Sequence, residues 1–217
     1  MGKAYLGNMS NQPMISIAGT VGVGKSTLTR KLSEVMGLQA MYEDVESNPY
    51  LDLYYKDLKE WSFHFQVHFL AQKLMMQRTI LENGSGIIQD RSIFEDVSIF
   101  VKMQYENGNM TLEEYKTYSL LAENIIKSQF FPKPDLLIYI DGKFEDIMKR
   151  VIKRGRVSES SIPLSYWEEL YYRYNKWINE FTLCPILKIC IDDYDCEDDE
   201  SILNVIDKIK VDFPLKI

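Results

Sequence analysis

The segment that most constrains the fold of this chain is Gly19-Thr20-Val21-Gly22-Val23-Gly24-Lys25-Ser26, which fits the pattern GxxxxGK(S/T). An apolar run of strand length, residues 14–18, precedes it, and a pattern of helical length, residues 25–36, follows it. Glycines let such a loop curl so that its N–H groups and the N-terminus of the next helix face phosphate oxygens. The sequence therefore predicts a nucleotide-phosphate site formed by Gly19, Thr20, Val21, Gly22, Val23, Gly24, Lys25, Ser26 and Thr27.

Short apolar runs alternate with longer helical patterns along the chain. The predicted strands are residues 14–18, 38–42, 86–89, 136–140 and 186–191, and the predicted helices are residues 25–36, 61–81, 94–105, 112–128, 144–153, 163–181 and 201–211. Strands separated by helices imply right-handed crossovers and a parallel sheet that is covered on both faces. We therefore expect a three-layer α/β fold with a five-stranded parallel sheet, and a ligand beyond the carboxyl ends of its strands.

The composition is that of an ordinary globular protein. Of the 217 residues, 46% are hydrophobic and 26% are charged, which excludes a disordered or fibrous chain. No repeat or linker divides the chain, so we expect residues 14–217 to form a single domain after a leader or disordered arm at residues 1–13. No apolar run reaches the roughly 20 residues that span a bilayer, and no signal peptide is visible, so the sequence predicts a soluble, cytoplasmic protein without a membrane partner.

The charge pattern argues against a nucleic acid as partner. Acidic residues outnumber basic ones 32 to 25, and seven of the acids fall within residues 192–200, without which the two counts are equal. No basic stripe or run is present, so an anion must be bound by locally arranged residues. The three cysteines, Cys184, Cys190 and Cys196, are odd in number and too widely spaced to indicate a disulfide framework or a metal site.

Further residues are predicted to handle the phosphates. Lys25 would reach the β- and γ-phosphates, and Ser26 would ligate Mg²⁺, with Asp90 after the third predicted strand holding the same ion through water. No DxxG or NKxD segment is present, which disfavours a switching GTPase. Three arginines gather at the end of one predicted helix, where they form either a solvated basic face or a lid that closes on transferring phosphates: Arg150, Arg154 and Arg156.

A second group of polar residues lies where the second and third predicted strands end. Glu43 follows one strand and Asp90-Arg91-Ser92 follows the other, so both reach the same edge of the sheet as the glycine-rich loop. A carboxylate there can take a proton from an attacking hydroxyl, and an arginine beside it can keep it oriented and ionised. We therefore predict Glu43, Arg91 and Lys25 to be the catalytic residues of a phosphoryl transfer.

Beyond the loop, a series of motifs resembles the deoxynucleoside kinase family. In order they are Glu43-Asp44-Val45, Asn48-Pro49-Tyr50-Leu51, Trp61-Ser62-Phe63-His64-Phe65-Gln66, Asp90-Arg91-Ser92-Ile93, Arg154-Gly155-Arg156 and Ile162-Pro163-Leu164. The chain is similar to the branch of deoxyadenosine, deoxyguanosine and deoxycytidine kinases. The resemblance implies a P-loop kinase fold with an arginine-rich lid, in an enzyme that uses Mg²⁺ and transfers the γ-phosphate of ATP to the 5′-hydroxyl of a deoxynucleoside in nucleotide salvage. It also implies a homodimer, formed through the predicted helices at residues 61–81 and 94–105.

The resemblance assigns roles within the acceptor site. Glu43 would be the general base, with Arg91 beside it. The nucleoside would be held by six further residues, with Tyr55 and Glu159 at the 3′-hydroxyl, Phe65 and Phe100 on the ring, and Gln66 and Asp96 at the edge of the base. From the residues alone, both phenylalanines could equally be core aromatics. An acidic loop would lie against the base of the ATP donor, through Asp192, Asp193, Tyr194, Asp195 and Cys196.

Three positions depart from the family's usual pattern or bear on its choice of base. Asp44 stands where the family usually has Pro, so we expect a less rigid turn after Glu43. Lys73 stands where the deoxycytidine and deoxyguanosine kinases have an Arg paired with the base-reading Asp; because Lys is a single mobile donor, we expect looser discrimination. Asn48 stands where the pyrimidine-handling relatives carry Trp, which would leave room for a purine.

The polarity of Asp96 predicts which bases are accepted. An ionised carboxylate only accepts hydrogen bonds, so it suits the amino group of adenine or cytosine. Lys73 could donate to the carbonyl of guanine. We therefore expect deoxyadenosine to be favoured, deoxycytidine and deoxyguanosine to be accepted as well, and thymidine to rank last.

Two other functions remain open at this point. A nucleoside monophosphate kinase of the thymidylate kinase type would need cations for the acceptor phosphate, whereas the second predicted strand is followed by Glu43, Asp44 and Glu46. A non-catalytic P-loop regulator would bind nucleotide without turnover. The presence of Glu43, Arg91 and the arginines of the predicted lid argues against it, and an assay with free nucleosides would decide.

Overall fold

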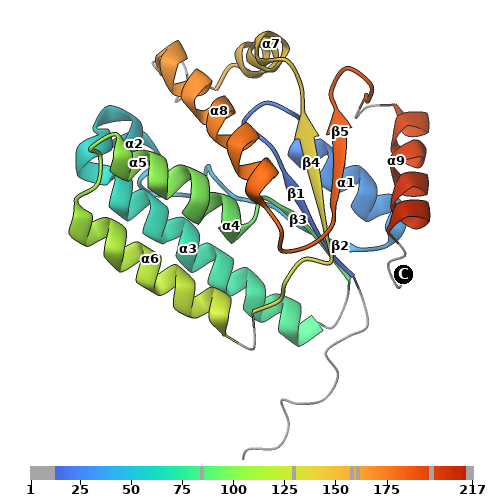
Figure 1. Cartoon of the computed structure of the whole chain (residues 1–217), viewed down its shortest axis with the longest axis horizontal. Coiled ribbons are helices and arrows are strands. Elements are labelled where there is room, and N and C mark those ends of the chain that lie inside the picture. The colour runs from blue at the N-terminus through green and yellow to red at the C-terminus, as the bar shows by residue number, and fades with distance from the viewer. Residues whose placement is uncertain are drawn as a thin grey trace, which may run out of the picture.

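Five parallel strands form one sheet in the computed structural model of the chain (Figure 1), which confirms the predicted fold class. They are β1 (Met14–Ala18), β2 (Gln39–Met41), β3 (Ile87–Asp90), β4 (Leu136–Asp141) and β5 (Ile186–Cys190), in the order β2-β3-β1-β4-β5. The structure describes residues 13–83, 86–128, 131–156, 159, 162–195 and 198–213, so residues 1–12 of the predicted arm lie outside the described residues.

Helices cover both faces of this sheet (Figure 1). They are α1 (Lys25–Met36), α2 (Leu51–Lys56), α3 (Leu58–Asn83), α4 (Ile93–Glu95), the π-helical turn η1 (Asp96–Val101), α5 (Lys102–Glu106), α6 (Leu112–Lys127), α7 (Phe144–Arg154), α8 (Leu164–Glu180) and α9 (Asp199–Asp212). Two features differ from the prediction. The short helix α2 was not predicted, because six residues are too few to show a helical period. The predicted helix at residues 94–105 is divided into α4, η1 and α5.

Alternate residues of the strands supply two separate cores, one on each face of the sheet. Ile138 and Ile140 of β4 pack with α1 and α9, whereas Leu137 and Tyr139 of the same strand pack with η1 and α8. All four side chains are buried. Because both faces of the sheet are covered, its strands consist mostly of apolar residues, which explains why they appear in the sequence as short apolar runs.

The order of the strands determines where a ligand can bind. The central strand β1 is hydrogen-bonded to β3 on one side and to β4 on the other, while the chain leaves β1 through α1 toward β2. At such a reversal the loops diverge, and a crevice opens beyond the carboxyl ends of the strands. The loops after β1, β2 and β3 carry the glycine-rich segment, Glu43 and Arg91, respectively.

Among the described residues, no helix is both long enough and apolar enough to span a lipid bilayer.

Candidate active site

The loop between β1 and α1 has the backbone that a phosphate site requires. Gly19 and Gly22 adopt φ angles of 145° and 90°, which residues with a side chain rarely adopt. A Cβ atom on Gly19 would lie 2.5 Å from the carbonyl oxygen of Ile140, and one on Gly22 would lie 2.6 Å from the Val151 side chain. Glycine is therefore needed at both positions for conformation as well as for space.

Lys25 opens α1 and points back over this loop. Its Nζ donates a 2.9 Å hydrogen bond to the carbonyl oxygen of Thr20, and the residue is buried. Burial, together with the nearby charge of Arg91, lowers the pKa of Lys25 to about 8. An ammonium that has lost its hydration on burial has a strong electrostatic preference for an anionic ligand such as a phosphate.

Ser26 and Asp90 meet across the strand ends as predicted for a pair that shares a metal ion. The Ser26 hydroxyl donates to Oδ2 of Asp90 at 2.5 Å. A hydroxyl and a carboxylate are hard oxygen ligands of the kind that Mg²⁺ prefers. The residues present therefore fit a magnesium ion that arrives with the nucleotide, and its binding there stays a prediction.

Glu43 and Arg91 face each other beyond β2 and β3. Nε of Arg91 lies 3.4 Å from Oε2 of Glu43, and the guanidinium also lies over the ring of Phe100 at 4.6 Å from its centre. Burial alone would raise the pKa of Glu43, but the positive charges of Arg91, Lys73 and Lys25 outweigh it and lower that pKa. Glu43 is therefore ionised at neutral pH and able to accept a proton.

The backbone at Arg91 is unusual. Its φ angle of 64° is the one positive φ at a residue other than glycine in the described part of the chain. Such conformations cost about 1–3 kcal/mol and tend to occur at functional sites, where the surrounding structure holds them. Immediately after it, the backbone N–H of Ser92 donates to the Glu95 carboxylate at 2.8 Å in a capping box that starts α4. The cap therefore fixes the exit of the strand that presents Arg91.

The turn after Glu43 is closed by Asp44 itself. Its Oδ1 accepts a 3.1 Å hydrogen bond from the backbone N–H of Ser47, and the Ser47 hydroxyl donates to the carbonyl oxygen of Asp44 at 3.3 Å. An aspartate that bonds a later backbone N–H in this way stabilises a turn without a proline ring. The expected loss of rigidity at this position is thus offset by side-chain hydrogen bonds.

A cavity of about 120 Å³ joins the loop to the acceptor residues. Most of the predicted site residues line it: Val21, Gly22, Lys25, Ser26, Glu43, Tyr55, Phe65, Gln66, Asp90, Arg91, Asp96, Phe100, Arg154, Arg156 and Glu159. Sequence segments that are more than a hundred residues apart thus converge on one space. The structure brings the predicted residues together, and their individual roles stay predictions.

Aromatic rings and polar groups meet at the far end of this cavity. Phe65 stacks on Tyr54 with ring centres 4.2 Å apart, so one face of Phe65 is already packed within the protein. Gln66 and Asp96 are buried. The Asp96 atom Oδ2 has no hydrogen-bond partner among the described residues, and burial raises the pKa of Asp96 to about 7. A buried carboxylate that lines a cavity and has an oxygen without a hydrogen bond fits a hydrogen-bond donor on a ligand.

Asp96 and Phe100 both lie in the π-helical turn η1, and both line the cavity. Its backbone bonds from residue i to residue i+5, so the turn is wider than that of an α-helix and changes which side chains share a face. Single turns of this kind are frequently found at functional sites. The 3.6-residue period assumed for residues 94–105 could not reveal it.

The arginines of the predicted lid are only partly assembled. Nη2 of Arg154 lies 2.6 Å from Oε1 of Glu159, and Nη1 of Arg156 lies 3.7 Å from the same oxygen. Arg150 lies one turn earlier in α7, is exposed and does not line the cavity. Glu159 thus holds two of the three arginines at the mouth of the site, and the third faces solvent.

The loop predicted to contact the donor base follows β5. Tyr194 is buried in the core between the sheet, α1 and α9, whereas Asp192, Asp193 and Asp195 are exposed. None of these four lines the described cavity, and Cys196 lies outside the described residues. Tyr194 therefore anchors the loop in the core, and contact with a donor base stays a prediction.

Sequence reasoning missed five residues that line the cavity: Val45, Tyr54, Phe69, Tyr166 and Trp167. The hydroxyls of Tyr54 and Tyr166 lie 3.3 Å apart, which ties α2 to α8. Phe69 follows Phe65 at helical spacing, and that spacing was a signal that could have found it. Tyr54 lies in the unpredicted helix α2, so no sequence signal marked it.

Asn48 lies beside the cavity and not in its lining. Its side-chain amide donates to the carbonyl oxygen of Phe65 at 3.3 Å and accepts from the backbone N–H of Tyr50 at 3.0 Å. The residue is buried and does not line the cavity. Asn48 thus joins the turn before α2 to α3, and its effect on the space for a purine stays a prediction.

Comparison with known proteins places these features in a family. The family model described as deoxynucleoside kinase matches residues 15–212. A deoxyadenosine/deoxycytidine kinase from Bacillus subtilis (strain 168) is 49% identical over 197 residues, which cover 90% of this chain and 91% of that protein. A deoxyadenosine kinase from Dictyostelium discoideum is 35% identical, over 81% of this chain and 71% of that protein.

A solved structure shares the fold as well. The deoxyadenosine kinase from M. mycoides, in a structure with bound dATP, superposes with a TM-score of 0.79 at 31% sequence identity. The match covers 91% of this chain and 99% of that one. The described architecture is therefore that of solved deoxynucleoside kinases.

Proposed function

This chain belongs to the deoxynucleoside kinase family, and from that premise we propose that it transfers the γ-phosphate of ATP to the 5′-hydroxyl of a deoxynucleoside. The observation that carries the proposal is that Lys25 and Glu43 line one cavity. Lys25 then supplies a cation for the phosphates of the donor, and Glu43 supplies an ionised carboxylate for the hydroxyl of the acceptor. Residues 14–217 would act as a single kinase domain in nucleotide salvage, in the cytoplasm.

The chemistry follows from what each group can hold. Glu43 accepts the proton of the 5′-hydroxyl as its oxygen attacks, and Arg91 keeps the carboxylate oriented. Lys25 and the loop N–H groups bind the phosphates, and the arginines of the lid add positive charge as phosphate negative charge redistributes. Mg²⁺ bound with ATP at Ser26 and Asp90 would neutralise part of that charge. Positioning and charge stabilisation thus account for most of the catalysis that we propose.

The nucleoside would lie in the part of the cavity beyond Glu43. We assign the 3′-hydroxyl to Tyr55 and Glu159, the ring to the space between Phe65 and Phe100, and the edge of the base to Gln66 and Asp96; all six line the cavity. The donor base would lie toward residues 192–196. The alternative of a nucleoside monophosphate kinase is less well supported, because the second strand ends in the carboxylate Glu43 where an acceptor phosphate would need a cation.

We expect deoxyadenosine to have the highest kcat/KM of the four common deoxynucleosides and thymidine the lowest. At pH 8 the Asp96 carboxylate is ionised, since its pKa is raised only to about 7 by burial. It can then accept from the amino group of adenine or cytosine but not from the carbonyl of thymine. The mismatch is worth about 1–3 kcal/mol, or about tenfold to a hundredfold. Steady-state kinetics with ATP and Mg²⁺ measures the ranking.

Two variants sharpen this test. Asp96→Asn replaces the buried carboxylate and should reduce the preference for deoxyadenosine, whereas Asp207→Asn changes an exposed aspartate of α9 and should not. Thymidine in first place would contradict the role of Asp96. Absence of turnover with every deoxynucleoside would instead support the alternative of a nucleotide-binding regulator.

We also propose a homodimer, formed through α3 and α6. These helices pack side by side (Figure 1) and expose large apolar side chains, at Leu74 and Met75 of α3 and at Leu112, Leu120 and Leu121 of α6. The segment 94–105, which the sequence suggested as the second interface helix, is largely buried within the subunit, so α6 takes its place in the proposal. Exposed large apolar side chains on neighbouring helices are typical of protein interfaces.

Light scattering at micromolar concentration should give the mass of a dimer for the wild-type protein and of a monomer for Leu120→Glu, because a charge in an apolar interface is costly to desolvate. Leu203→Glu, at a similarly exposed leucine of α9, is the control and should remain a dimer. A monomeric wild-type protein, or a dimer that survives Leu120→Glu, would rule out this interface.

A further inference from the structure

One lysine contacts both carboxylates of the acceptor site. Nζ of Lys73, in α3, lies 3.5 Å from Oε1 of Glu43 and 3.7 Å from Oδ2 of Asp96. The same nitrogen donates a 2.8 Å hydrogen bond to the carbonyl oxygen of Arg91. The Lys73 side chain is only 3% exposed. A single ammonium group thus connects the loop after β2, the loop after β3 and the π-helical turn η1.

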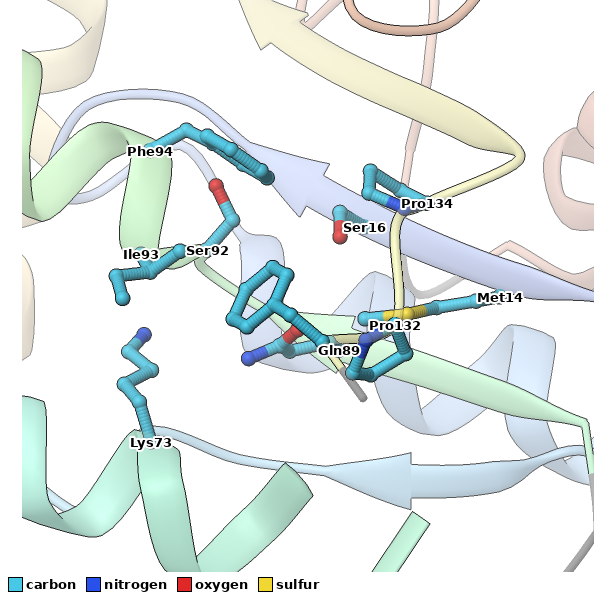
Figure 2. Close-up of a pocket in the computed structure, with 10 residues that line it drawn as sticks. Met14, Ser16, Lys73, Gln89, Ser92, Ile93, Phe94, Pro132 and Pro134 are labelled. Carbon is cyan, nitrogen blue, oxygen red and sulfur yellow. The ribbon is translucent and has the colours of Figure 1, made fainter. Parts of the chain in front are cut away.

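Lys73 makes these contacts from outside the substrate cavity. Glu43 and Asp96 line the large cavity, but Lys73 does not. It lines a second cavity of about 10 Å³, together with Ser16, Gln89 and other residues (Figure 2). This volume is close to that of a single water molecule. In Figure 2 the side chain extends from α3 toward Ile93. A nucleoside in the large cavity would therefore meet the two carboxylates and not the lysine.

The charges around Lys73 favour its ammonium form. Burial works to lower the pKa of Lys73, but Asp96, Glu43 and Glu95 outweigh burial and raise it. In turn, Lys73 and Arg91 favour the ionised forms of both Glu43 and Asp96. Other titratable groups face these carboxylates from the packed elements: Lys25 of α1, Glu95 of α4 and Tyr118 of α6.

The ammonium group of Lys73 approaches three oxygen atoms at different distances. An ammonium has three donors; the 2.8 Å bond to the Arg91 carbonyl is the shortest of these contacts, and the approach to Glu43 at 3.5 Å is a weak hydrogen bond. The approaches to Glu43 and Asp96 are ion pairs at longer range. The lysine is therefore shared between the two carboxylates and committed to neither of them.

From this geometry, and resting on the kinase function proposed above, we propose that Lys73 is a positioning residue that links recognition of the base to proton transfer. Its charge stabilises the Glu43 carboxylate in the ionised form that accepts the 5′-hydroxyl proton. It also holds Asp96 at the edge of the base. Because one ammonium serves both groups, a change in charge at Asp96 alters the electric field at Glu43.

The test is the pH dependence of kcat for deoxyadenosine. The acid limb of kcat reports the general base in the enzyme–substrate complex, so removal of Lys73 should move that limb to higher pH. An opposite charge within about 4–6 Å changes a carboxyl pKa by about 1–3 units, and Lys73→Met should shift the limb upward by about that amount. Lys73→Arg retains the charge and should bring the limb back toward the wild-type position. Lys102→Met, an exposed lysine of α5, is the matched control and should leave it unchanged.

Two further variants keep the test decisive. Lys73→Gln retains hydrogen-bond donors without the charge, and it replaces Lys73→Met in the test if the methionine variant does not fold. It should also shift the acid limb of kcat to higher pH. Asp96→Asn removes the second carboxylate, so the ammonium acts on Glu43 alone and the acid limb of kcat should move to lower pH. If Lys73 had only a structural role, its substitution would lower kcat without shifting the acid limb of the pH profile.

The possible failures are distinguishable. If the wild-type protein is active and the limb of a folded Lys73→Met or Lys73→Gln protein coincides with that of the wild type, the role of Lys73 is overturned while the kinase function stands. The same holds if Lys73→Arg shifts the limb as far as Lys73→Met does. A wild-type protein that phosphorylates no deoxynucleoside would overturn the proposed function and this role together.

Discussion

Replacing Glu43 by glutamine is expected to lower kcat for deoxyadenosine by about 10²-fold or more, because general bases contribute about 10²–10⁴-fold to such reactions. Glutamine keeps the shape of the side chain but cannot take the proton of the 5′-hydroxyl. In the proposed arrangement ATP binds at the end of the cavity formed by the glycine-rich loop, so its affinity should change little. Rapid-quench or coupled steady-state assays give kcat, and titration with ATP gives the affinity.

Two further variants show whether the fall in kcat comes from the loss of the carboxylate at position 43. Glu43→Asp keeps a carboxylate one methylene shorter, so its activity should fall between the wild-type and Glu43→Gln values. Glu34→Gln, at an exposed residue of α1, should be unaffected. Near-normal turnover by a folded Glu43→Gln protein would show that another group accepts the proton.

Replacing Lys25 by methionine is expected to weaken ATP binding and to lower kcat, in total by about 10²–10³-fold in kcat/KM. In the proposed mechanism the ammonium of Lys25 contacts phosphate oxygens before and during transfer, so both parameters should change together. Lys176→Met, at an exposed lysine of α8, serves as the control. Unchanged ATP affinity and unchanged kcat would show that the glycine-rich loop is a structural turn and not a phosphate site.

The same substitution should stabilise the protein in the absence of nucleotide. Burial lowers the pKa of Lys25 from 10.5 to about 8. At about 1.4 kcal/mol per pKa unit, the charged Lys25 lowers the free energy of unfolding by up to about 3 kcal/mol below pH 8. The variant also loses the hydrogen bond to Thr20, so its net gain in stability is smaller than this. Between pH 8 and 10.5 the unfolded chain binds more protons, so the wild type should gain stability relative to Lys25→Met as the pH rises.

Thermal or urea unfolding across this pH range measures the difference. We expect Lys25→Met to be the more stable protein at pH 7 and the advantage to shrink toward pH 10.5. A variant that is less stable than the wild type at pH 7 would contradict the account of Lys25 as a charge that is buried at a cost to stability.

Local sequence determined the parts of this protein that depend on near neighbours. The glycines at 19 and 22 were recognisable because their positions next to an apolar run and a helix encode a backbone that only glycine adopts readily. The order of strands and helices followed from hydrophobic period, since each element must bury one or both of its faces. Glu43 and Arg91 could be placed together because parallel strands all end at the same edge of a sheet.

Only the tertiary structure decided features that depend on contacts between distant segments or on departures from regular geometry. The π-helical turn η1 divides what the sequence predicts as one helix, because its wider turn is held by packing against α8, α3 and α6 and leaves no period to detect. The direction of Asn48, which faces α3 and not the cavity, depends on a carbonyl oxygen 17 residues away.

The position of Lys73 shows the same limit at the site itself. Its place in a helix was predictable, but the sequence does not say which side chains its ammonium reaches. Glu43 precedes Lys73 in the sequence and Asp96 follows it. The three charges lie close together in the folded protein because a buried charge needs a partner of opposite sign away from water. Hydrophobic pattern thus determined the layers and the edge where the site lies, and long-range packing decided which charges meet there.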